Sequence, residues 1–381
     1  MPGIGAEVAF RHVVKRFGDA APAVNDLSFT IEPGTICVLV GPSGCGKTTS
    51  LRMVNRLIEP TSGQILIDGQ DIMSEEPTTL RRRIGYVIQQ VGLFPHQTIG
   101  QNVATVPRLL RWPEERIQQR IDELLKLIGL DPERVRNRYP SQLSGGERQR
   151  VGVARAMAAE PPVMLMDEPF GAVDPIVRER LQNEFLRLHR EQRTTVIFVT
   201  HDIDEAIKMG DRVAVLREGG VLAQYASPAE LLTRPASEFV ARFVGADRGL
   251  KRLALVTVAD VALEQAATIH ENEVLGSPED GVPMAGAKYR LLLDGEDRPL
   301  GWLNTLRMAA GERASRGAAE PSSPLLTYDT TLRDTLSQLL GLAVQTGVVV
   351  DETGRYAGTV TVQQIASTLR AAIESPPEVP A

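Results

Sequence analysis

The sequence predicts an α/β fold with a parallel β-sheet at its centre, followed by a smaller α+β part. Three observations lead to this prediction. Residues 35–40 and 163–166 form continuous, mostly apolar runs, which suit strands that are buried on both faces of a parallel sheet. A glycine-rich loop and a helical spacing of apolar residues follow the first run, at residues 41–56. After Gly245 these motifs end, and a strand–turn–strand pattern occurs twice.

The loop after the first run has the pattern G-x-x-x-x-G-K-[ST] of a phosphate-binding loop. Its residues are Gly41, Pro42, Ser43, Gly44, Cys45, Gly46, Lys47 and Thr48, followed by Thr49. Glycines allow backbone N–H groups to point at a polyphosphate, and the helix that begins here presents its positive end to the anion. Lys47 would reach the outer phosphates, and the Thr48 hydroxyl would hold Mg²⁺. We therefore predict a nucleoside triphosphate site, in which Cys45 is a small filler.

Two further strands end in polar residues that suit hydrolysis of the terminal phosphate. The run at residues 163–166 is followed by Asp167 and Glu168. Asp167 suits a role in holding Mg²⁺, and Glu168 can polarise the attacking water as a general base. The apolar run at residues 195–200 is followed by His201. Because ligands bind at the carboxyl ends of parallel strands, we predict catalytic roles for Glu168 and His201.

The composition excludes several classes of function. The chain has 381 residues, of which 43% are hydrophobic and 4% are aromatic, enough for two or three domains with ordinary cores. A net charge of −6 gives no basic field for nucleic acid. Cys37 and Cys45 suggest neither a disulfide framework nor a metal site. No run reaches the roughly 18 apolar residues of a membrane span, and residues 1–5 do not resemble a signal peptide, so we expect membrane association only through partners.

Taken in order, these motifs resemble those of the ATP-binding subunit of an ATP-binding cassette (ABC) transporter, a P-loop NTPase. The resemblance covers roughly residues 5–245 and includes the LSGGE signature at residues 143–147, with Glu168 on the catalytic glutamate and His201 on the switch histidine. It implies ATP and Mg²⁺ as ligands. It also implies a RecA-like core, an antiparallel β subdomain and a helical subdomain at about residues 98–158.

The resemblance also implies roles for residues outside the phosphate-binding loop. Gln89 falls on a glutamine that contacts magnesium and senses the transmembrane partner, and Phe17 falls on an aromatic residue that stacks on adenine. The implied magnesium ligands are Thr48, Gln89 and Asp167. In this family the signature segment closes over the nucleotide of a second copy, so catalysis implies a homodimer. The residues that would act in trans are Ser144, Gly145, Gly146, Glu147 and Asp174.

The remainder of the chain contains an internal repeat. Residues 292–303 align with residues 349–360 and share Asp, Arg and Gly at equal spacing. The two copies resemble a degenerate tandem pair of CBS modules, the regulatory repeats of the cystathionine-β-synthase type. Modules that bind adenosine ligands commonly have an aspartate where this chain has Arg307 and Gln364. A dimerising or spacing role is therefore favoured over ligand binding.

The expected domain organisation follows from these two resemblances. Residues 309–324, rich in glycine and alanine, are expected to link the two CBS-like copies. The expected parts are an ABC-type domain at residues 1–245, a tandem CBS-like domain at 246–372 and a disordered tail at 373–381.

An ABC ATPase with a carboxyl-terminal CBS pair most resembles the ATP-binding subunits of importers for glycine betaine, carnitine, choline or proline. Residues 55–63, 84–96 and 243–249 also resemble that subfamily. The implied partners are a second copy, integral membrane permease subunits and an extracytoplasmic solute-binding protein, with a peripheral location at the cytoplasmic face of the inner (cell) membrane and no nucleic acid. Two alternatives stay open: an import ATPase for another cargo, such as an amino acid, a sugar or a metal complex, and a soluble ABC ATPase without a permease.

Overall fold

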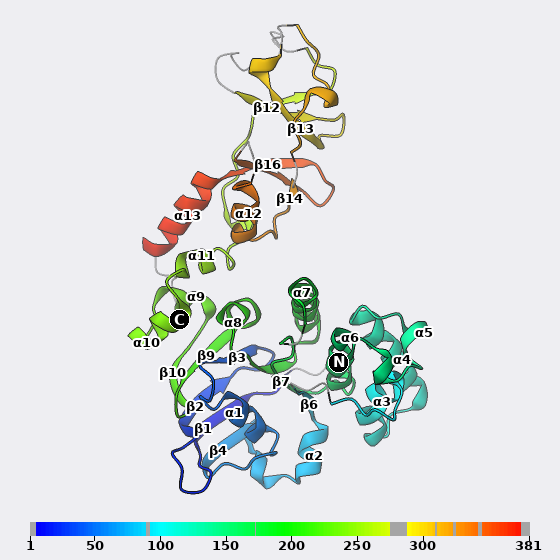
Figure 1. Cartoon of the computed structure of the whole chain (residues 1–381), viewed down its shortest axis with the longest axis vertical. Coiled ribbons are helices and arrows are strands. Elements are labelled where there is room, and N and C mark those ends of the chain that lie inside the picture. The colour runs from blue at the N-terminus through cyan, green and yellow to red at the C-terminus, as the bar shows by residue number, and fades with distance from the viewer. Residues whose placement is uncertain are drawn as a thin grey trace. The chain divides into compact units, whose positions relative to one another are not determined.

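The computed structural model describes most of the chain, and it divides the chain into two compact units. The described residues are 5–88, 92–171, 173–274, 288–308, 311–322, 325–341 and 345–374. The first unit comprises Met1–Gly245 and the second comprises Ala246–Ala381 (Figure 1). Among the described residues, no helix combines the length and the apolar character needed to cross a membrane.

A six-stranded sheet forms the centre of the first unit. Its strands, in spatial order, are β10 (Val221–Ala226), β9 (Arg212–Arg217), β3 (Ile36–Val40), β8 (Thr195–Val199), β7 (Val163–Asp167) and β6 (Ile84–Val87). All neighbours pair in parallel except β10 and β9, which pair antiparallel. Every residue of β3, β7 and β8 is buried. This burial explains why these strands are apolar at consecutive positions rather than at alternate ones.

Helices and a second sheet surround this centre. The helices are α1 (Lys47–Val54), α2 (Pro77–Arg82), α7 (Pro175–Gln192), α8 (Ile203–Met209), α9 (Pro228–Thr233) and α10 (Glu238–Val244), with a 3₁₀ turn η1 (Ile72–Ser74). The second sheet is antiparallel and has the spatial order β2 (Val24–Ile31), β1 (Val8–Lys15), β4 (Ser62–Ile67) and β5 (Gln70–Asp71).

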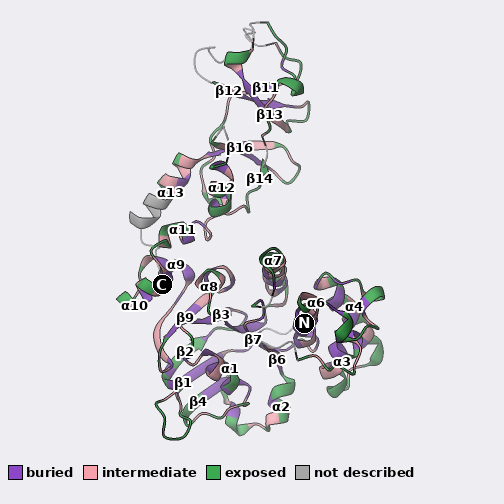
Figure 2. Cartoon of the chain, viewed as in Figure 1, coloured by how far each residue is buried: buried purple, intermediate pink, exposed green. Residues whose placement is uncertain are grey.

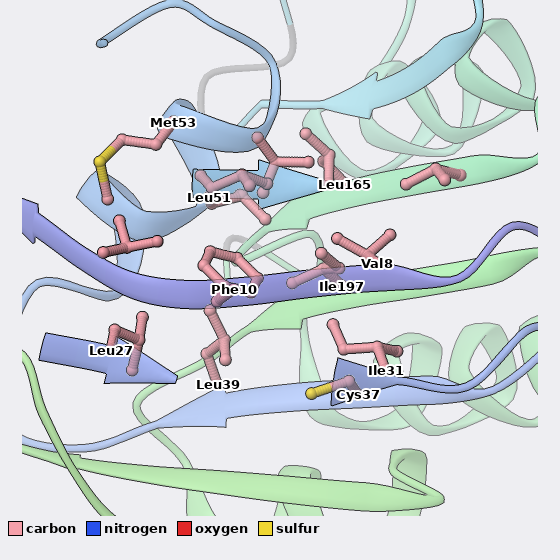
Figure 3. Close-up of a cluster of buried hydrophobic side chains, with 14 of the residues drawn as sticks. Val8, Phe10, Leu27, Ile31, Cys37, Leu39, Leu51, Met53, Leu165 and Ile197 are labelled. Carbon is pink, nitrogen blue, oxygen red and sulfur yellow. The ribbon is translucent and has the colours of Figure 1, made fainter. Parts of the chain in front are cut away.

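One hydrophobic core joins the two sheets to α1. Phe10 and Leu27 of the antiparallel sheet are in the same buried cluster as Leu39 of β3, Leu51 of α1 and Ile197 of β8 (Figure 3). Each of these side chains is at most 2% exposed. Burying a side chain of this size contributes about 1.5–3 kcal/mol. The core therefore fixes β3 and α1, and with them the two ends of the loop that connects them.

A helical subdomain interrupts the first unit between β6 and β7. Its elements are α3 (Ile99–Leu109), α4 (Glu114–Leu127), α5 (Pro132–Val135), the 3₁₀ turn η2 (Pro140–Gln142) and α6 (Gly145–Met157). Thr98 and Ser144 begin α3 and α6 with capping boxes, and Gly129 turns the chain after α4 in a left-handed conformation. Helix α6 contacts α3 and α4 on one side and β6 on the other (Figure 1).

The second unit contains two three-stranded sheets of the same topology. The first consists of β11 (Thr268–His270), β12 (Tyr289–Leu293) and β13 (Pro299–Asn304), and the second of β14 (Leu325–Leu326), β15 (Thr346–Val350) and β16 (Tyr356–Thr361). In each, the first pair of strands is parallel and the second is antiparallel. The helices and turns are α11 (Arg248–Arg252), η3 (Val258–Asp260), η5 (Thr305–Arg307), η6 (Arg316–Ala318), α12 (Leu332–Leu339) and α13 (Val362–Glu374).

The two sheets repeat each other at the level of single hydrogen bonds. The Asp294 carboxylate accepts backbone N–H bonds from residues 296 and 298, and the Asp351 carboxylate accepts them from residues 353 and 355. These bonds lower the pKa of both carboxyl groups; for Asp351 the hydroxyl of residue 353 makes the largest contribution. The Asp and Gly shared by the aligned segments therefore occupy equivalent places in two similar hairpins. Both sheets are buried mainly along their central strands (Figure 2).

The structure corrects one expectation for the second unit. Residues 309–324 were expected to link the two copies, but within residues 311–322 the chain is packed on the first sheet. Arg313 and Glu320 form antiparallel bridges with Val274 and Trp302, and Ala314 is fully buried. This segment therefore completes the first sheet. Of the tail expected at residues 373–381, residues 373 and 374 belong to α13, and the rest lie outside the described residues.

We predict that Gly301→Ala destabilises the first sheet of the second unit, whereas Gly295→Ala does not. A Cβ atom at Gly301 would lie 2.5 Å from the Glu320 carbonyl oxygen, and one at Gly295 would meet no atom within 4 Å. The clash should cost about 1–3 kcal/mol. Hydrogen exchange of the full-length chain, followed by mass spectrometry, should show faster exchange in β12 and β13 for Gly301→Ala alone. Equal exchange in both variants would contradict the close packing of Glu320.

Candidate functional site

The loop between β3 and α1 forms one wall of a cleft in the first unit, with a volume of about 260 Å³. Its lining residues are Ala23, Ser43, Gly44, Cys45, Gly46, Lys47, Thr48, Thr49, Glu168 and His201. All except Ala23 are residues that the sequence predicts to bind or act on the nucleotide. The structure therefore brings the phosphate-binding loop, Glu168 and His201 together at the carboxyl ends of three parallel strands.

Close backbone packing requires glycine at two positions of the loop. A Cβ atom on Gly41 would lie 2.2 Å from the carbonyl oxygen of Leu216 in β9. A Cβ atom on Gly46 would lie 2.3 Å from the carbonyl oxygen of Ala23, and Gly46 has a left-handed φ of 89°. Larger residues would push the loop away from both neighbours. By contrast, Gly44 faces open space, because a Cβ atom there would meet nothing within 4 Å.

Lys47 and Thr48, the first two residues of α1, point their polar atoms at the loop and at β7. The Lys47 ammonium donates to the carbonyl oxygens of Gly41 at 2.7 Å and Pro42 at 2.9 Å. The Thr48 hydroxyl donates to Asp167 Oδ1 at 3.0 Å. An ammonium with only neutral acceptors and a hydroxyl beside a carboxylate are arranged for a phosphate and a divalent cation, respectively.

Burial controls the protonation of two groups in the site. It raises the pKa of the Cys45 thiol, although the Lys47 ammonium opposes the effect. The thiol therefore stays protonated at neutral pH and is a poor nucleophile, in agreement with its interpretation as a filler. Asp167 is 3% exposed, and burial raises the pKa of its carboxyl group, against the hydrogen bond from Thr48. A cation bound beside Asp167 would favour its charged form.

Glu168 has a left-handed backbone conformation, which is unusual for a residue other than glycine. Its φ is 47°. Its N–H donates to the carbonyl of Val199 in β8 at 3.0 Å, and its own carbonyl accepts from the Gly171 N–H at 3.2 Å. Such a conformation costs on the order of 1–3 kcal/mol and persists only where surrounding contacts hold it. These bonds keep the Glu168 side chain at the mouth of the cleft.

His201 follows β8 and faces the same carboxylate. Its Nδ1 lies 3.1 Å from Glu168 Oε1. The Glu168 side chain is 23% exposed and the His201 side chain is 64% exposed, so both groups are accessible from the cleft. After His201, Asp202 begins α8 by accepting hydrogen bonds from the backbone N–H groups of residues 204 and 205. This cap holds the loop that carries the histidine.

The residues predicted to act in trans do not line this cleft. Ser144 and Glu147 bond to each other's backbone N–H at the start of α6, at 3.3 Å and 2.8 Å, and these bonds lower the pKa of the Glu147 carboxyl group. Gly145 and Gly146 face open space. Asp174 begins α7 by accepting from the backbone N–H of residue 177 at 3.1 Å.

Four other predicted residues that the structure describes are not among the lining residues: Phe17, Gly41, Pro42 and Asp167. Phe17 follows β1 and is 52% exposed, with the Lys15 ammonium 5.0 Å from its ring centroid. Gln89 lies outside the described residues. The sequence analysis missed Ala23, which lines the cleft and lies against Gly46. Its position just before the strand Val24–Ile31 carries no motif, so only the tertiary structure identifies it.

Comparisons with known proteins agree with this geometry. The sequence model of the ABC transporter family matches residues 24–171. The osmoprotectant import ATP-binding protein OsmV of Salmonella typhimurium is 45% identical over 94% of this chain and 94% of its own length. The carnitine transport ATP-binding protein OpuCA of Listeria monocytogenes is 44% identical over 92% of this chain and 89% of its own length.

Among solved structures, the dimeric ATP-binding cassette MJ0796 in a post-hydrolysis state bound to ADP and Pi is similar to this chain. The match has a TM-score of 0.53 and 34% sequence identity, and it covers 58% of this chain and 98% of that one. The predicted α/β cassette fold is thereby confirmed. The chain belongs to the ABC transporter family, in the group of import ATP-binding proteins to which these relatives belong.

Proposed function

We propose that this chain is the ATP-hydrolysing subunit of an importer for quaternary-amine osmoprotectants of the glycine betaine, carnitine, choline and proline class. The observation that carries the proposal is the identity to OsmV, because it extends over 94% of both chains and thus over both units. The cleft supports the ATPase part of the proposal independently of any relative. None of its residues meets a transported solute, so the cargo rests on kinship alone.

In this proposal, the loop at residues 41–49 binds the phosphates of ATP and Phe17 stacks on the adenine. The Lys47 ammonium exchanges its two carbonyl acceptors for phosphate oxygens, which are charged and form stronger hydrogen bonds. Oxygen ligands from Thr48 and Asp167 suit Mg²⁺, and Gln89 would be a third ligand. When bound, the ion would neutralise charge on the terminal phosphates.

We assign the proton transfer of hydrolysis to Glu168. Its carboxylate is accessible from the cleft and is fixed by the backbone bonds to Val199 and Gly171, so it can orient a water molecule and accept its proton. His201, at 3.1 Å, holds the carboxylate in place and can contact the terminal phosphate from the other side. Both groups come from the ends of neighbouring parallel strands, which sets their separation without a flexible connection.

A second copy of the chain would complete the site. The signature residues 144–147 and Asp174 do not line the cleft of their own chain, which supports their action on the nucleotide of a partner. The Ser144 oxygen accepts one hydrogen bond as a helix cap, and a phosphate would compete with the Glu147 carboxylate for its hydroxyl hydrogen. The first turn of α6 would add backbone N–H groups where charge develops. The dimeric state of MJ0796 agrees with this arrangement.

Transport would require further partners. The relatives are named as import proteins, and no described helix of this chain could span a membrane. We propose that integral membrane permease subunits provide the pathway and that an extracytoplasmic solute-binding protein delivers the cargo. The dimer would then lie at the cytoplasmic face of the cell membrane as a peripheral subunit.

We propose a spacing or dimerising role for the second unit, as a degenerate tandem CBS-like domain at residues 246–372 that follows the cassette at 1–245 in the sequence. The repeated hairpins support the tandem assignment. The Gln364 side chain accepts from the Thr361 N–H at 2.7 Å and donates to the Ala262 carbonyl at 2.9 Å, so it serves the start of α13. The Arg307 guanidinium lies 3.5 Å from a Glu320 carboxylate oxygen. Neither residue offers the carboxylate that would hold a ribose.

Cells that lack this protein should lose uptake of radiolabelled quaternary amines at high osmolarity. Re-expression of the wild-type chain should restore uptake, and re-expression of Glu168→Gln should not, because import needs hydrolysis.

Affinity capture of the tagged chain from solubilised membranes should recover a permease. Normal quaternary-amine uptake together with loss of sulfate, sugar or amino-acid uptake would assign another cargo, and capture without any permease would favour a soluble ATPase.

Glu168→Gln should lower kcat for ATP hydrolysis by at least about 100-fold while ATP still binds, since the amide cannot accept the proton from water. Steady-state hydrolysis and equilibrium binding of a fluorescent ATP analogue measure the two quantities. Glu115→Gln makes the same charge change on the exposed surface of α4 and should leave both unchanged. Wild-type turnover by Glu168→Gln would show that another group is the base.

Lys47→Ala should instead weaken binding of ATP itself, because it removes the ammonium beside the phosphates. A lost charged hydrogen bond corresponds to about 1.5–3 kcal/mol, or roughly a 10- to 100-fold increase in Kd. Isothermal titration calorimetry with ATP measures this change. The exposed Lys126 of α4 provides the control, and Lys126→Ala should bind as the wild type does. Equal affinities of the two variants would contradict the phosphate site.

A further inference from the structure

Helix α6 makes a buried hydrogen bond to the segment that carries the proposed catalytic carboxylate. Gln149, in the second turn of α6, is 4% exposed. Its side-chain nitrogen donates to the carbonyl oxygen of Pro169, the residue after Glu168. Its side-chain oxygen has no hydrogen-bond partner in the described part of the chain. The amide therefore serves one identified contact, which crosses from the helical subdomain to the core.

The accepting carbonyl belongs to a segment that is fixed on its other side. Phe170 is 3% exposed, and its ring centroid lies 5.9 Å from that of Phe198 in β8. Glu168 is held in its left-handed conformation by bonds to Val199 and Gly171. The Pro169 carbonyl lies between Glu168 and Phe170, and through it α6 contacts the backbone next to Glu168. A shift of Gln149 would therefore act on a residue whose conformation already depends on its neighbours.

The same helix begins at the signature segment. Ser144 caps α6, and Gln149 lies five positions after it, which corresponds to about 7.5 Å along a helix axis. A capped helix moves as a rigid element over this distance, because its backbone hydrogen bonds fix the spacing of its residues. A displacement of the helix at Ser144 is therefore transmitted to Gln149, because no flexible loop lies between the two residues.

We propose that Gln149 is a positioning residue that links the signature segment to Glu168 of the same chain. The inference rests on the proposed function, in which the signature segment contacts the nucleotide bound by a second copy. Binding of ATP at one site then affects the carboxylate of the other site. The effect passes through α6, the Gln149 side chain and the Pro169 carbonyl. Hydrolysis at the two sites becomes cooperative because each carboxylate is held fully in place only when the partner has bound ATP.

Gln149→Met tests this link with little change in shape. Methionine has a similar length and is apolar, so it removes the donor to Pro169 and also the buried oxygen that lacks a partner. We expect kcat to fall about 10-fold, while the affinity for ATP and the midpoint of thermal unfolding stay near the wild-type values. The Hill coefficient for ATP should fall towards 1. Gln149→Leu also lacks the NH₂ donor, adds no buried charge and should show the same pattern.

The neighbouring residue supplies a matched control. The Arg150 guanidinium also donates from α6 to backbone carbonyls, but these belong to Ile128 and Gly129 of the helical subdomain, at 2.8 Å and 3.2 Å. Arg150→Met removes hydrogen bonds of the same kind from the same helix, and the acceptors of these bonds lie outside the segment of Glu168. We expect its kcat and Hill coefficient to stay within about twofold of the wild-type values.

Two results would overturn the inference. Wild-type kcat and cooperativity in both Gln149 variants would show that the bond transmits nothing. A joint loss of kcat, ATP affinity and thermal stability in both variants would show that Gln149 only supports the fold. Glu168→Gln, measured beside them on the full-length chain, separates this failure from failure of the proposed function. If Glu168→Gln is inactive and the Gln149 variants are active, only the link is wrong; if Glu168→Gln is fully active, the assignment of the base is wrong.

Discussion

The site depends on backbone atoms that approach each other closely from two different sheets. The loop between β3 and α1 lies against the Leu216 carbonyl of the parallel sheet at Gly41 and against the Ala23 carbonyl beside the antiparallel sheet at Gly46. A cluster of buried side chains holds these sheets together, so the core of the first unit determines the shape of the loop. Close backbone contacts rather than long side chains determine the shape of this loop. The same contacts set the positions from which the Lys47 ammonium and the Thr48 hydroxyl extend.

The parallel sheet also explains why the backbone is strained at Glu168 and not at His201. Strand β7 ends in Asp167, which stays within the sheet and is buried, and the next residue must leave the sheet at once to reach the cleft. Glu168 makes that turn in a left-handed conformation and is held by Val199, Gly171 and the neighbouring Pro169 bond. His201 leaves β8 through an ordinary capped turn. The strained position therefore coincides with the group to which we assign the proton transfer.

The structure could be predicted from the sequence where one short segment contained both the apolar pattern of a strand and the polar residues that follow it. Strands β3, β7 and β8 are continuous apolar runs because both of their faces are covered, and the polar residues after them are where parallel strands end. Ala23 and Gln149 could not be found in this way, because their importance comes from partners more than 20 residues away or on another element. Segment 311–322 was misinterpreted as a linker for the same reason: its composition is flexible, but its bridges to Val274 and Trp302 are tertiary.

Under the proposed tandem CBS-like assignment, the second unit would keep a repeated fold without a ligand site. In both hairpins an aspartate accepts two backbone N–H bonds of its own turn, and a glycine lies opposite the same position of the preceding strand. These residues serve the shape of the hairpin and recur in both copies. The positions that would serve a nucleoside are instead Arg307 and Gln364, and Gln364 is bonded within the fold. Duplicated turns, together with the use of a proposed ligand position at a helix start, would suit the spacing or pairing of subunits that we propose for this unit.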